Sequence, residues 1–365
     1  MRNLCRLPGF SRGKSYRIIA AAVLSILALA LAGDTTAGWD AACEAQMLEA
    51  AQIMERAIAA VSRHRKTLGQ IPEADIDPNG TGLIGRELDE LTTSLGHLEA
   101  KRTTTNPNMA GLIVYLLRQA GIRAGDRIAV GSSGSFPALL IASLAAAEAL
   151  GARPVAIISL GASSFGATDS SFDLLELYQF LLGQGIVSVA PAAISLGGGG
   201  DIGLDFEPDL KDRLMRQISA SGIPFLYEPD LAVNVARRMQ IYDGAAAFIN
   251  AGGSHANLGT SDLVLNLKPG LNRSLNLPPE KDRGVIFKMA ERGIPIIHLL
   301  FIKGLAAQYN LPWDPVPLPR PNATQIPSAS RPAGVRFWAV AGLYSVALIL
   351  LCIPWPIRRD GAVKN

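Results

Sequence analysis

Four short loops rich in glycine and serine carry the groups with which this chain could do chemistry. Each loop follows a continuous apolar run, typical of a strand that is buried on both faces. In an open parallel sheet, ligands bind where loops leave the carboxyl ends of the strands, so the loops are predicted to meet at one edge. Glycine lets backbone N–H groups approach a ligand and serine adds hydroxyls, which suits a carboxylate or a phosphate. The loops are residues 131–135, 161–164, 197–200 and 252–255.

The first of these loops, Gly131-Ser132-Ser133-Gly134-Ser135, comes just before Pro137, and proline is favoured in the first turn of a helix. Ser135 is predicted to cap that helix and to leave the loop's N–H groups free for an anion. Ser133 or Ser135 could instead be a nucleophile. The hydrolase pattern Gly-x-Ser-x-Gly is broken, however, because Ser135 replaces its second glycine, and the lysine of a P-loop is missing. A purely structural turn is the third interpretation.

His255, in the fourth loop, is the candidate general base of the rim that the four loops are predicted to form, because the unperturbed pKa of histidine lies near neutrality. A surface histidine without a role is the competing interpretation. Asp201, directly after four glycines, and Asp169, after the second loop, are the carboxylates best placed to orient a base or hold a cation. Their spacing does not match a metal site, so neither a metal nor a cofactor is expected.

Two adjacent cations followed by hydroxyls precede the first helix of the predicted sheet domain, in the run Lys101-Arg102-Thr103. Arginine can hold a carboxylate through two parallel hydrogen bonds, so this run could grip an anion. A solvated basic turn, with Asn106-Pro107 capping the next helix, is the alternative. The complete set of candidate ligand-binding residues is Lys101, Arg102, Thr103, Ser132, Gly134, Ser163, Ser164, Gly198, Gly199, Asp201, Gly252, Gly253 and Ser254.

The elements that must position these residues alternate between helix and strand from about residue 108 to residue 308. This alternation predicts an α/β fold with a mostly parallel, doubly wound sheet of about six strands. The predicted strands are 127–130, 155–160, 186–195, 224–227, 245–250 and 295–300, and the predicted helices are 109–119, 137–150, 174–183, 207–220, 231–242 and 281–292. Residues 40–67 precede them as a long amphipathic helix. Residues 75–80 resemble part of a calcium loop without its closing glutamate, which favours a plain turn.

Both ends of the chain are apolar and flanked by basic residues. Residues 18–32 follow several cations and predict a signal peptide or an uncleaved signal anchor. Residues 337–357 are apolar and are followed by Arg358 and Arg359, which predicts a transmembrane helix with the body outside the cytoplasm. The expected organisation is 1–33 signal or anchor, 34–79 amphipathic helix and linker, 80–310 extracytoplasmic α/β domain, 311–334 proline-rich tether, 335–358 transmembrane helix and 359–365 cytoplasmic tail.

Charge and cysteine usage exclude two classes of function. The chain has 34 basic and 31 acidic residues, but nine of the basic residues and one of the acidic residues lie within 1–33 and 335–365. The body is therefore acidic, and nucleic acid is not an expected partner. Cys43 is the single cysteine of the body, so neither an internal disulfide nor a cysteine metal site is predicted.

Five motifs between residues 92 and 253 combine hydroxyls, glycines and two cations. They are Thr92-Thr93-x-x-Gly96-x-Leu98-x-Ala100-Lys101-Arg102-Thr103, Ser132-Ser133-Gly134-Ser135-Phe136-Pro137-Ala138-Leu139, Ala162-Ser163-Ser164-x-Gly166-Ala167, Ser195-Leu196-Gly197-Gly198 and Ile249-Asn250-x-Gly252-Gly253. Together these motifs resemble the membrane-anchored family called poly-gamma-glutamate system protein. The resemblance covers roughly residues 80–260, and it implies work beside the bacterial ligase and the membrane subunits that make and export poly-γ-glutamate. It implies no catalytic residue in this chain.

Two function hypotheses follow. Poly-γ-glutamate presents one carboxylate per unit, and a rim of N–H groups, hydroxyls and cations suits such groups. We therefore predict a component, tethered to the cell membrane, that assists synthesis, export or processing of poly-γ-glutamate, or of another anionic polymer, and binds its chains. The alternative is a serine-type hydrolase or transferase acting on γ-glutamyl amide bonds with Ser133 or Ser135, His255 and an acid.

Overall fold

The structure is a computed structural model that describes residues 20–28, 41–70, 73–322 and 335–352. The chain divides into two compact units, one formed by residues 1–39 with 328–365 and the other by residues 40–327. In the first unit, residues 20–28 are helical and α12 spans Val335–Cys352. The remaining parts of the predicted signal segment and of the predicted transmembrane helix, as well as the predicted cytoplasmic tail, lie outside the described residues.

Within the described ranges, no helix is long and apolar enough to cross a membrane.

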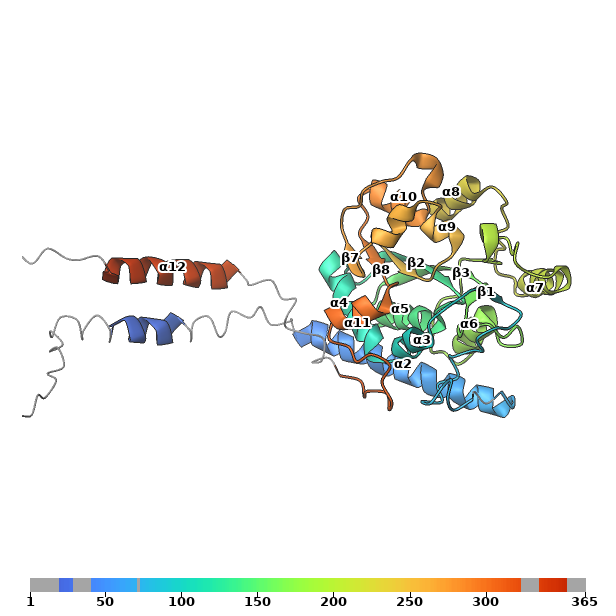
Figure 1. The fold of residues 1–365 in the computed structure, drawn as a ribbon, viewed down its shortest axis with the longest axis horizontal. Helices are drawn as coiled ribbons and strands as arrows, with labels where there is room; N and C mark the ends of the chain where they lie inside the picture. Colours follow the sequence, from blue (N-terminus) through green and yellow to red (C-terminus); the bar gives the residue numbers. More distant parts are fainter. Residues whose placement is uncertain (1–19, 29–40, 71–72, 323–334, 353–365) are drawn as a thin grey trace, which may run out of the picture. The chain divides into compact units, whose positions relative to one another are not determined.

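The second unit, here called the body, is an α/β domain built on a six-stranded sheet (Figure 1). The strand order is β5-β3-β2-β6-β8-β7, and every neighbouring pair is parallel except β7 and β8. The predicted mostly parallel sheet is thereby confirmed. The strands of this sheet are β2 (Arg127–Ser133), β3 (Arg153–Ser159), β5 (Ala193–Ser195), β6 (Ala247–Ala251), β7 (Gly270–Asn272) and β8 (Ile296–His298).

Helices cover both faces of the sheet (Figure 1). One face packs against α8, α9 and α10, whose apolar side chains share a buried cluster with Ile157, Phe248 and Ile296 of the strands. On the other side α5 packs on the strands, and α2 and α4 pack against α5. The helices are α2 (Ala41–Thr67), α3 (Leu98–Thr104), α4 (Asn108–Ala120), α5 (Pro137–Leu150), α6 (Leu174–Gly183), α7 (Pro208–Ala220), α8 (Leu231–Ile241), α9 (His255–Leu258), α10 (Val285–Glu291) and α11 (Ile302–Gln308).

Local sequence signals explain where the central helices begin and end. Helix α5 has Pro137 in its first turn and ends at Gly151, which adopts the left-handed conformation with φ of 63°. All of its residues except Glu148 are buried, because it lies between the sheet and two other helices. Asp173 and Asp230 cap α6 and α8, each accepting two backbone N–H groups. Each of these four residues therefore lies at, or next to, the helix end that it determines.

The sheet differs from the prediction at its two edges. Strand β5 is shorter than the predicted 186–195, and residues 224–227 form only an isolated bridge between Phe225 and Ile194. Pro191 lies in the lost part of the strand, where its missing N–H disfavours sheet pairing. The sixth strand is instead β7, which pairs antiparallel with β8. A second, two-stranded sheet joins β1 (Thr92–Ser94) to β4 (Ala162–Ser163).

The body also includes segments that were predicted to lie outside the α/β domain, namely the amphipathic helix and the proline-rich tether. Helix α2 buries Met47, Met54 and Val61 against the rest of the body, so it is part of the core. Residues 311–322 of the predicted proline-rich tether pack on the body as well. Asn79 donates to the carbonyl of Pro315, and the Asn108 side chain bonds the backbone of residues 320 and 322. The α/β unit is therefore larger than the predicted 80–310.

Candidate functional site

The strand order places a topological switch point between β2 and β6. The chain runs outward from β2 through β3 to β5 on one side, and from β6 to β8 on the other. Loops that diverge from neighbouring parallel strands leave a crevice at the carboxyl ends of these strands. A pocket of about 320 Å³ lies there. It is lined by Thr93, Ser94, Ser133, Ser135, Ser159, Gly161, Gly197, Gly198, Gly199, Asp205, Gly253, Ser254, His255, Leu258 and Gly259.

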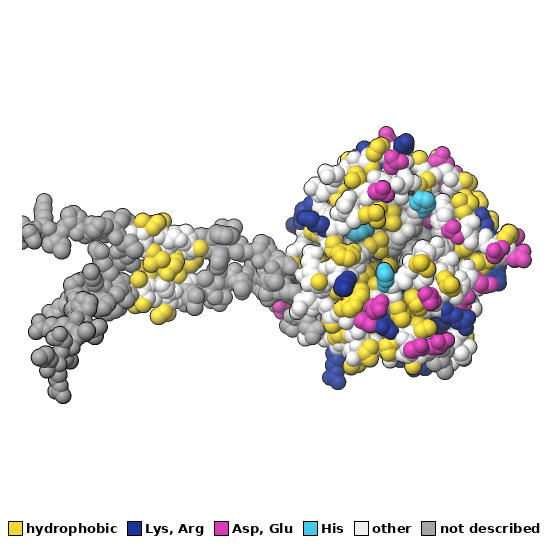
Figure 2. Space-filling view, viewed as in Figure 1, with side chains coloured by type: hydrophobic (Ala, Val, Ile, Leu, Met, Phe, Trp, Pro, Cys, Tyr) yellow, Lys and Arg dark blue, Asp and Glu magenta, His cyan; other side chains and the backbone are white. Residues whose placement is uncertain are grey.

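All four glycine- and serine-rich loops contribute to this lining, so their predicted meeting at one edge of the sheet is confirmed. Among the described residues that line the pocket there is no lysine or arginine, and Asp205 is the one carboxylate. On the face of the body seen in Figure 2, acidic and basic side chains are interspersed rather than separated by sign. The pocket can therefore bind an anion through neutral donors and His255, and not through a cluster of cations.

Three serines form a ladder across the carboxyl ends of β2, β3 and β5. Ser133 is paired in register with Ser159, and Ser159 with Ser195, so their side chains share one face of the sheet. Ser159 and Ser195 bond each other at 2.8 Å between their Oγ atoms. Ser133, by contrast, is 3% exposed, and its Oγ has no hydrogen-bond partner within the described part of the chain. A buried hydroxyl without a partner is costly, so this atom is available to a ligand or to water.

Gly252 explains why Ser133 is so closely covered. A Cβ at position 252 would lie 2.4 Å from Ser133 Oγ and 2.6 Å from Ser133 N. Only glycine leaves room for this approach of β6 to the end of β2. The glycine is thus required by packing against the candidate hydroxyl, and it does not itself line the pocket.

A buried network of one ion pair and several hydrogen bonds connects the serine ladder to Asp201, which directly follows the glycine loop 197–200. Arg238 Nη2 lies 2.5 Å from Asp201 Oδ2, and both side chains are 0% exposed. Asp201 also accepts hydrogen bonds from Ser159 Oγ and Ser195 Oγ, at 3.1 and 2.9 Å, and from Asn234 Nδ2 at 3.2 Å. The predicted role of Asp201 in ligand binding is therefore corrected. Its carboxylate is fully used inside the body and does not line the pocket.

The glycine loop at 197–200 is already bonded to a carboxylate of the same chain. The N–H of Gly199 donates to Asp205 Oδ2 at 2.5 Å. A Cβ at Gly198 would lie 2.7 Å from the same oxygen, so a side chain there would displace the aspartate. Sequence reasoning missed Asp205, although an acid four to six residues after a glycine run could have suggested such a contact.

His255 is exposed and lies at the pocket, but it is not part of a catalytic triad. Its Nδ1 accepts a hydrogen bond from the N–H of Gly200 at 3.1 Å, so the neutral ring carries its proton on Nε2. Among the described residues, no serine or carboxylate forms a hydrogen bond with this ring. The histidine can therefore donate to an anion from Nε2, while Ser133 and Ser135 lack an assembled base.

Ser135 and Ser163 lie beside a buried lysine. Phe136, and not Ser135, is the N-cap of α5, and its side chain makes no capping hydrogen bond. The Ser135 hydroxyl accepts instead from the Ser163 N–H at 3.0 Å, which corrects the predicted cap. Lys101 Nζ donates to the Ser135 carbonyl, lies 2.6 Å from Ser163 Oγ and stands 3.8 Å from the centre of the Phe136 ring. Its burial lowers the pKa of Lys101 to about 7.

The other predicted ligand-binding residues hold segments of the body together. Arg102 forms a two-pronged pair with Asp314, at 2.7 and 2.5 Å, and thus binds the proline-rich segment instead of an anionic ligand. Thr103 accepts from the N–H of Asp314. Gly134 bonds the Ser159 carbonyl and the Ala167 N–H through its backbone, and Ser164 bonds the Ser94 carbonyl. Ser132 is fully buried in β2, on the face opposite to Ser133.

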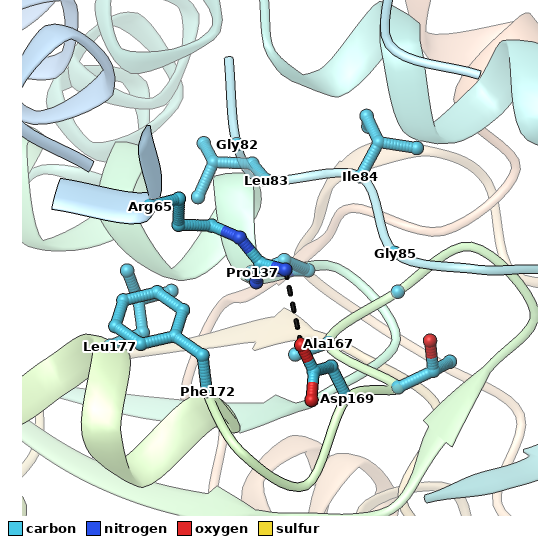
Figure 3. Close-up of a pocket in the computed structure, with 12 residues that line it drawn as sticks. Arg65, Gly82, Leu83, Ile84, Gly85, Pro137, Ala167, Asp169, Phe172 and Leu177 are labelled. Atoms are coloured by element: carbon cyan, nitrogen blue, oxygen red, sulfur yellow. Dashed lines mark hydrogen bonds and ion pairs between the residues drawn. The ribbon is translucent and has the colours of Figure 1, made fainter. Parts of the chain in front are cut away.

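Asp169 lies at a separate contact between α2 and the loop after β4. Its carboxylate pairs with Arg65 at 3.2 Å, and the Arg65 guanidinium stands 5.3 Å from the centre of the Phe172 ring (Figure 3). The adjoining cavity of about 10 Å³ has room for about one water molecule. Asp169 therefore neither orients His255 nor holds a cation at the pocket. Among the described residues, no cluster of three or more His, Cys, Asp or Glu could hold a metal ion.

No known protein family, curated protein or solved structure gives a significant match to this chain.

Proposed function

We propose that this protein is a membrane-tethered, extracytoplasmic component that assists synthesis, export or processing of poly-γ-glutamate and binds its γ-glutamyl chains in the pocket at the switch point. The observation that carries the proposal is the buried hydroxyl of Ser133, which has no hydrogen-bond partner among the described residues and lines a pocket to which all four glycine- and serine-rich loops contribute. The motifs that resemble the poly-gamma-glutamate system family supply the identity of the polymer. Its membrane synthase subunits are the proposed protein partners.

The chemistry of the lining supports a carboxylate ligand. Ser133 Oγ, Ser135 Oγ and His255 Nε2 are each able to donate a hydrogen bond, and a side-chain carboxylate would accept such bonds. A volume of about 320 Å³ is at the lower end of the range for small-molecule pockets, which suits one monomer unit rather than a long stretch of polymer. Because neutral donors dominate, affinity should depend only weakly on salt, in contrast to a site built from Lys101 and Arg102.

The membrane tether rests on the two apolar terminal segments and their basic flanks. Within the terminal unit, the hydroxyls of Ser25 and Tyr344 lie 2.7 Å apart, so the helical residues 20–28 contact α12. This contact supports an N-terminal segment that is retained as an anchor. With both basic flanks on the cytoplasmic side, the body lies outside the cell membrane. Protease added to intact spheroplasts should digest the body, and full protection would contradict this topology.

A second candidate function, hydrolysis or transfer of γ-glutamyl amide bonds, is favoured by one observation. Lys101 Nζ and Ser163 Oγ are 2.6 Å apart, and a lysine pKa of about 7 leaves much of the amine neutral and able to accept a proton. Ser163 is buried and does not line the pocket, so the substrate would have to reach it by a local opening. This geometry makes binding the first candidate and catalysis the second.

Titration calorimetry on the purified full chain, with γ-glutamyl oligomers of defined length, tests the proposal. Ser133→Ala should weaken binding about tenfold, because it removes a hydrogen bond to a charged group. Arg102→Ala is the matched control, since that side chain is held by Asp314 and should leave affinity unchanged. If the oligomers do not bind, the proposal is wrong. Shortening of the oligomers that is lost in Ser163→Ala would favour the hydrolase instead.

A further inference from the structure

Asp205 gives the pocket an acceptor that a simple anion site would not contain. It is an exposed residue, and its Oδ2 is fixed by the Gly199 N–H at 2.5 Å. Its Oδ1 makes no hydrogen bond within the described ranges. In the described part of the chain, no lysine or arginine lines the pocket to neutralise this carboxylate. The aspartate therefore repels a ligand that is only anionic, and it attracts a ligand that carries an ammonium group.

The same pocket contains donors that a simple cation would leave unsatisfied. Ser133 Oγ is buried and has no partner within the described residues, and the neutral His255 ring carries a proton on Nε2. A ligand that matches both parts of the lining has an ammonium group for Asp205 and a carboxylate for Ser133 and His255. An α-amino acid carries these two groups on one carbon atom.

In a γ-linked glutamyl chain, the α-amino group of each residue except the first is consumed in an amide bond, while each α-carboxylate remains free. Only the first residue therefore presents a free ammonium and a free carboxylate on the same carbon. We propose that the pocket binds the amino-terminal residue of the γ-glutamyl chain, with its ammonium on Asp205 and its α-carboxylate on Ser133 and His255. This inference rests on the proposed function for the identity of the polymer. In this proposal, the protein binds the amino-terminal end of the chain and not its interior residues.

The test compares γ-glutamylglutamate with its N-acetylated form by titration calorimetry on the full chain. Acetylation removes the ammonium, so it should weaken binding to the wild-type protein about tenfold or more, the effect of losing a hydrogen bond between charged groups. In Asp205→Asn the two ligands should bind with similar affinity. The matched control is Asp212→Asn, which changes an exposed acid on α7 and should keep the discrimination.

A second ligand separates loss of recognition from loss of folding. Glutarate has two carboxylates and no amino group, so Asp205→Asn should bind it more tightly than the wild type does, because the repulsion is removed. Weaker binding of one ligand together with tighter binding of the other cannot come from an unfolded pocket. Equal binding of the free and the acetylated dipeptide to the wild type would overturn the chain-end inference and leave the proposed function standing. Absence of binding by both dipeptides would overturn the proposed function itself.

Discussion

Replacing Lys101 with methionine should change how the stability of the body depends on pH. Burial lowers the pKa of Lys101 from its ordinary value of 10.5 to about 7, while the lysine of the unfolded chain keeps the ordinary value. Between these two values the unfolded state binds more protons, so the free energy of unfolding rises with pH across this window. A pKa shift of one unit corresponds to about 1.4 kcal/mol. The shift of Lys101 should therefore change the free energy of unfolding by about 5 kcal/mol across this window.

This magnitude is an upper value, because three groups around Nζ favour the ammonium: the Ser135 carbonyl, Ser163 Oγ and the ring of Phe136. Urea denaturation followed by circular dichroism, repeated from about pH 6 to about pH 10, measures the effect. As the pH rises over this range, the free energy of unfolding of the wild type should increase by up to about 5 kcal/mol relative to that of Lys101→Met. Lys268→Met, at an exposed position, should show no such trend. A difference for Lys101→Met that is constant with pH would refute the reasoning.

Two further predictions concern the layer beneath the pocket. Asp201→Ala should cost about 3–5 kcal/mol in urea denaturation, because it leaves the fully buried guanidinium of Arg238 without its counter-charge. Adding Arg238→Met should recover most of this loss, and a double variant no more stable than Asp201→Ala would contradict the pairing. Gly252→Ala should cost about 1–3 kcal/mol, since its Cβ would overlap the backbone N and the Oγ of Ser133. Gly183→Ala, where nothing lies within 4 Å of the added Cβ, is the control, and equal effects at the two positions would argue against the close contact.

Local patterns in the sequence were sufficient for the class of fold and for the place of the pocket. The predicted bounds of α5 and α6 match the structure, because a proline at the start, a glycine at the end and an aspartate cap act within a few residues of the helix. The buried strands β2, β3 and β6 could be found from continuous apolar runs, although their predicted ends differ from the observed ends by up to three residues. Since parallel strands end at one edge, their loops had to meet there.

The partners of individual side chains could not be found in this way. Ser135 follows the pattern of a helix cap, yet its hydroxyl bonds the N–H of Ser163 from another loop. Arg102 lies 212 positions before its partner Asp314, and no local feature of either residue indicates the pair. The sixth strand was missed for a related reason: β7 has three residues and is a strand only because it pairs with β8.

The sequence by itself determined an α/β body with glycine- and serine-rich loops at one edge of a parallel sheet, because strand burial, helix caps and glycine placement are encoded over short spans. The tertiary structure decided which groups remain available to a ligand. It paired Asp201 with Arg238 and brought Asp205 against the glycine loop. Within the part of the chain that the structure describes, it left Ser133 Oγ without a hydrogen-bond partner. The physical reason is that hydrogen bonds and ion pairs form between atoms a few ångströms apart, and this proximity is set by packing across the whole chain.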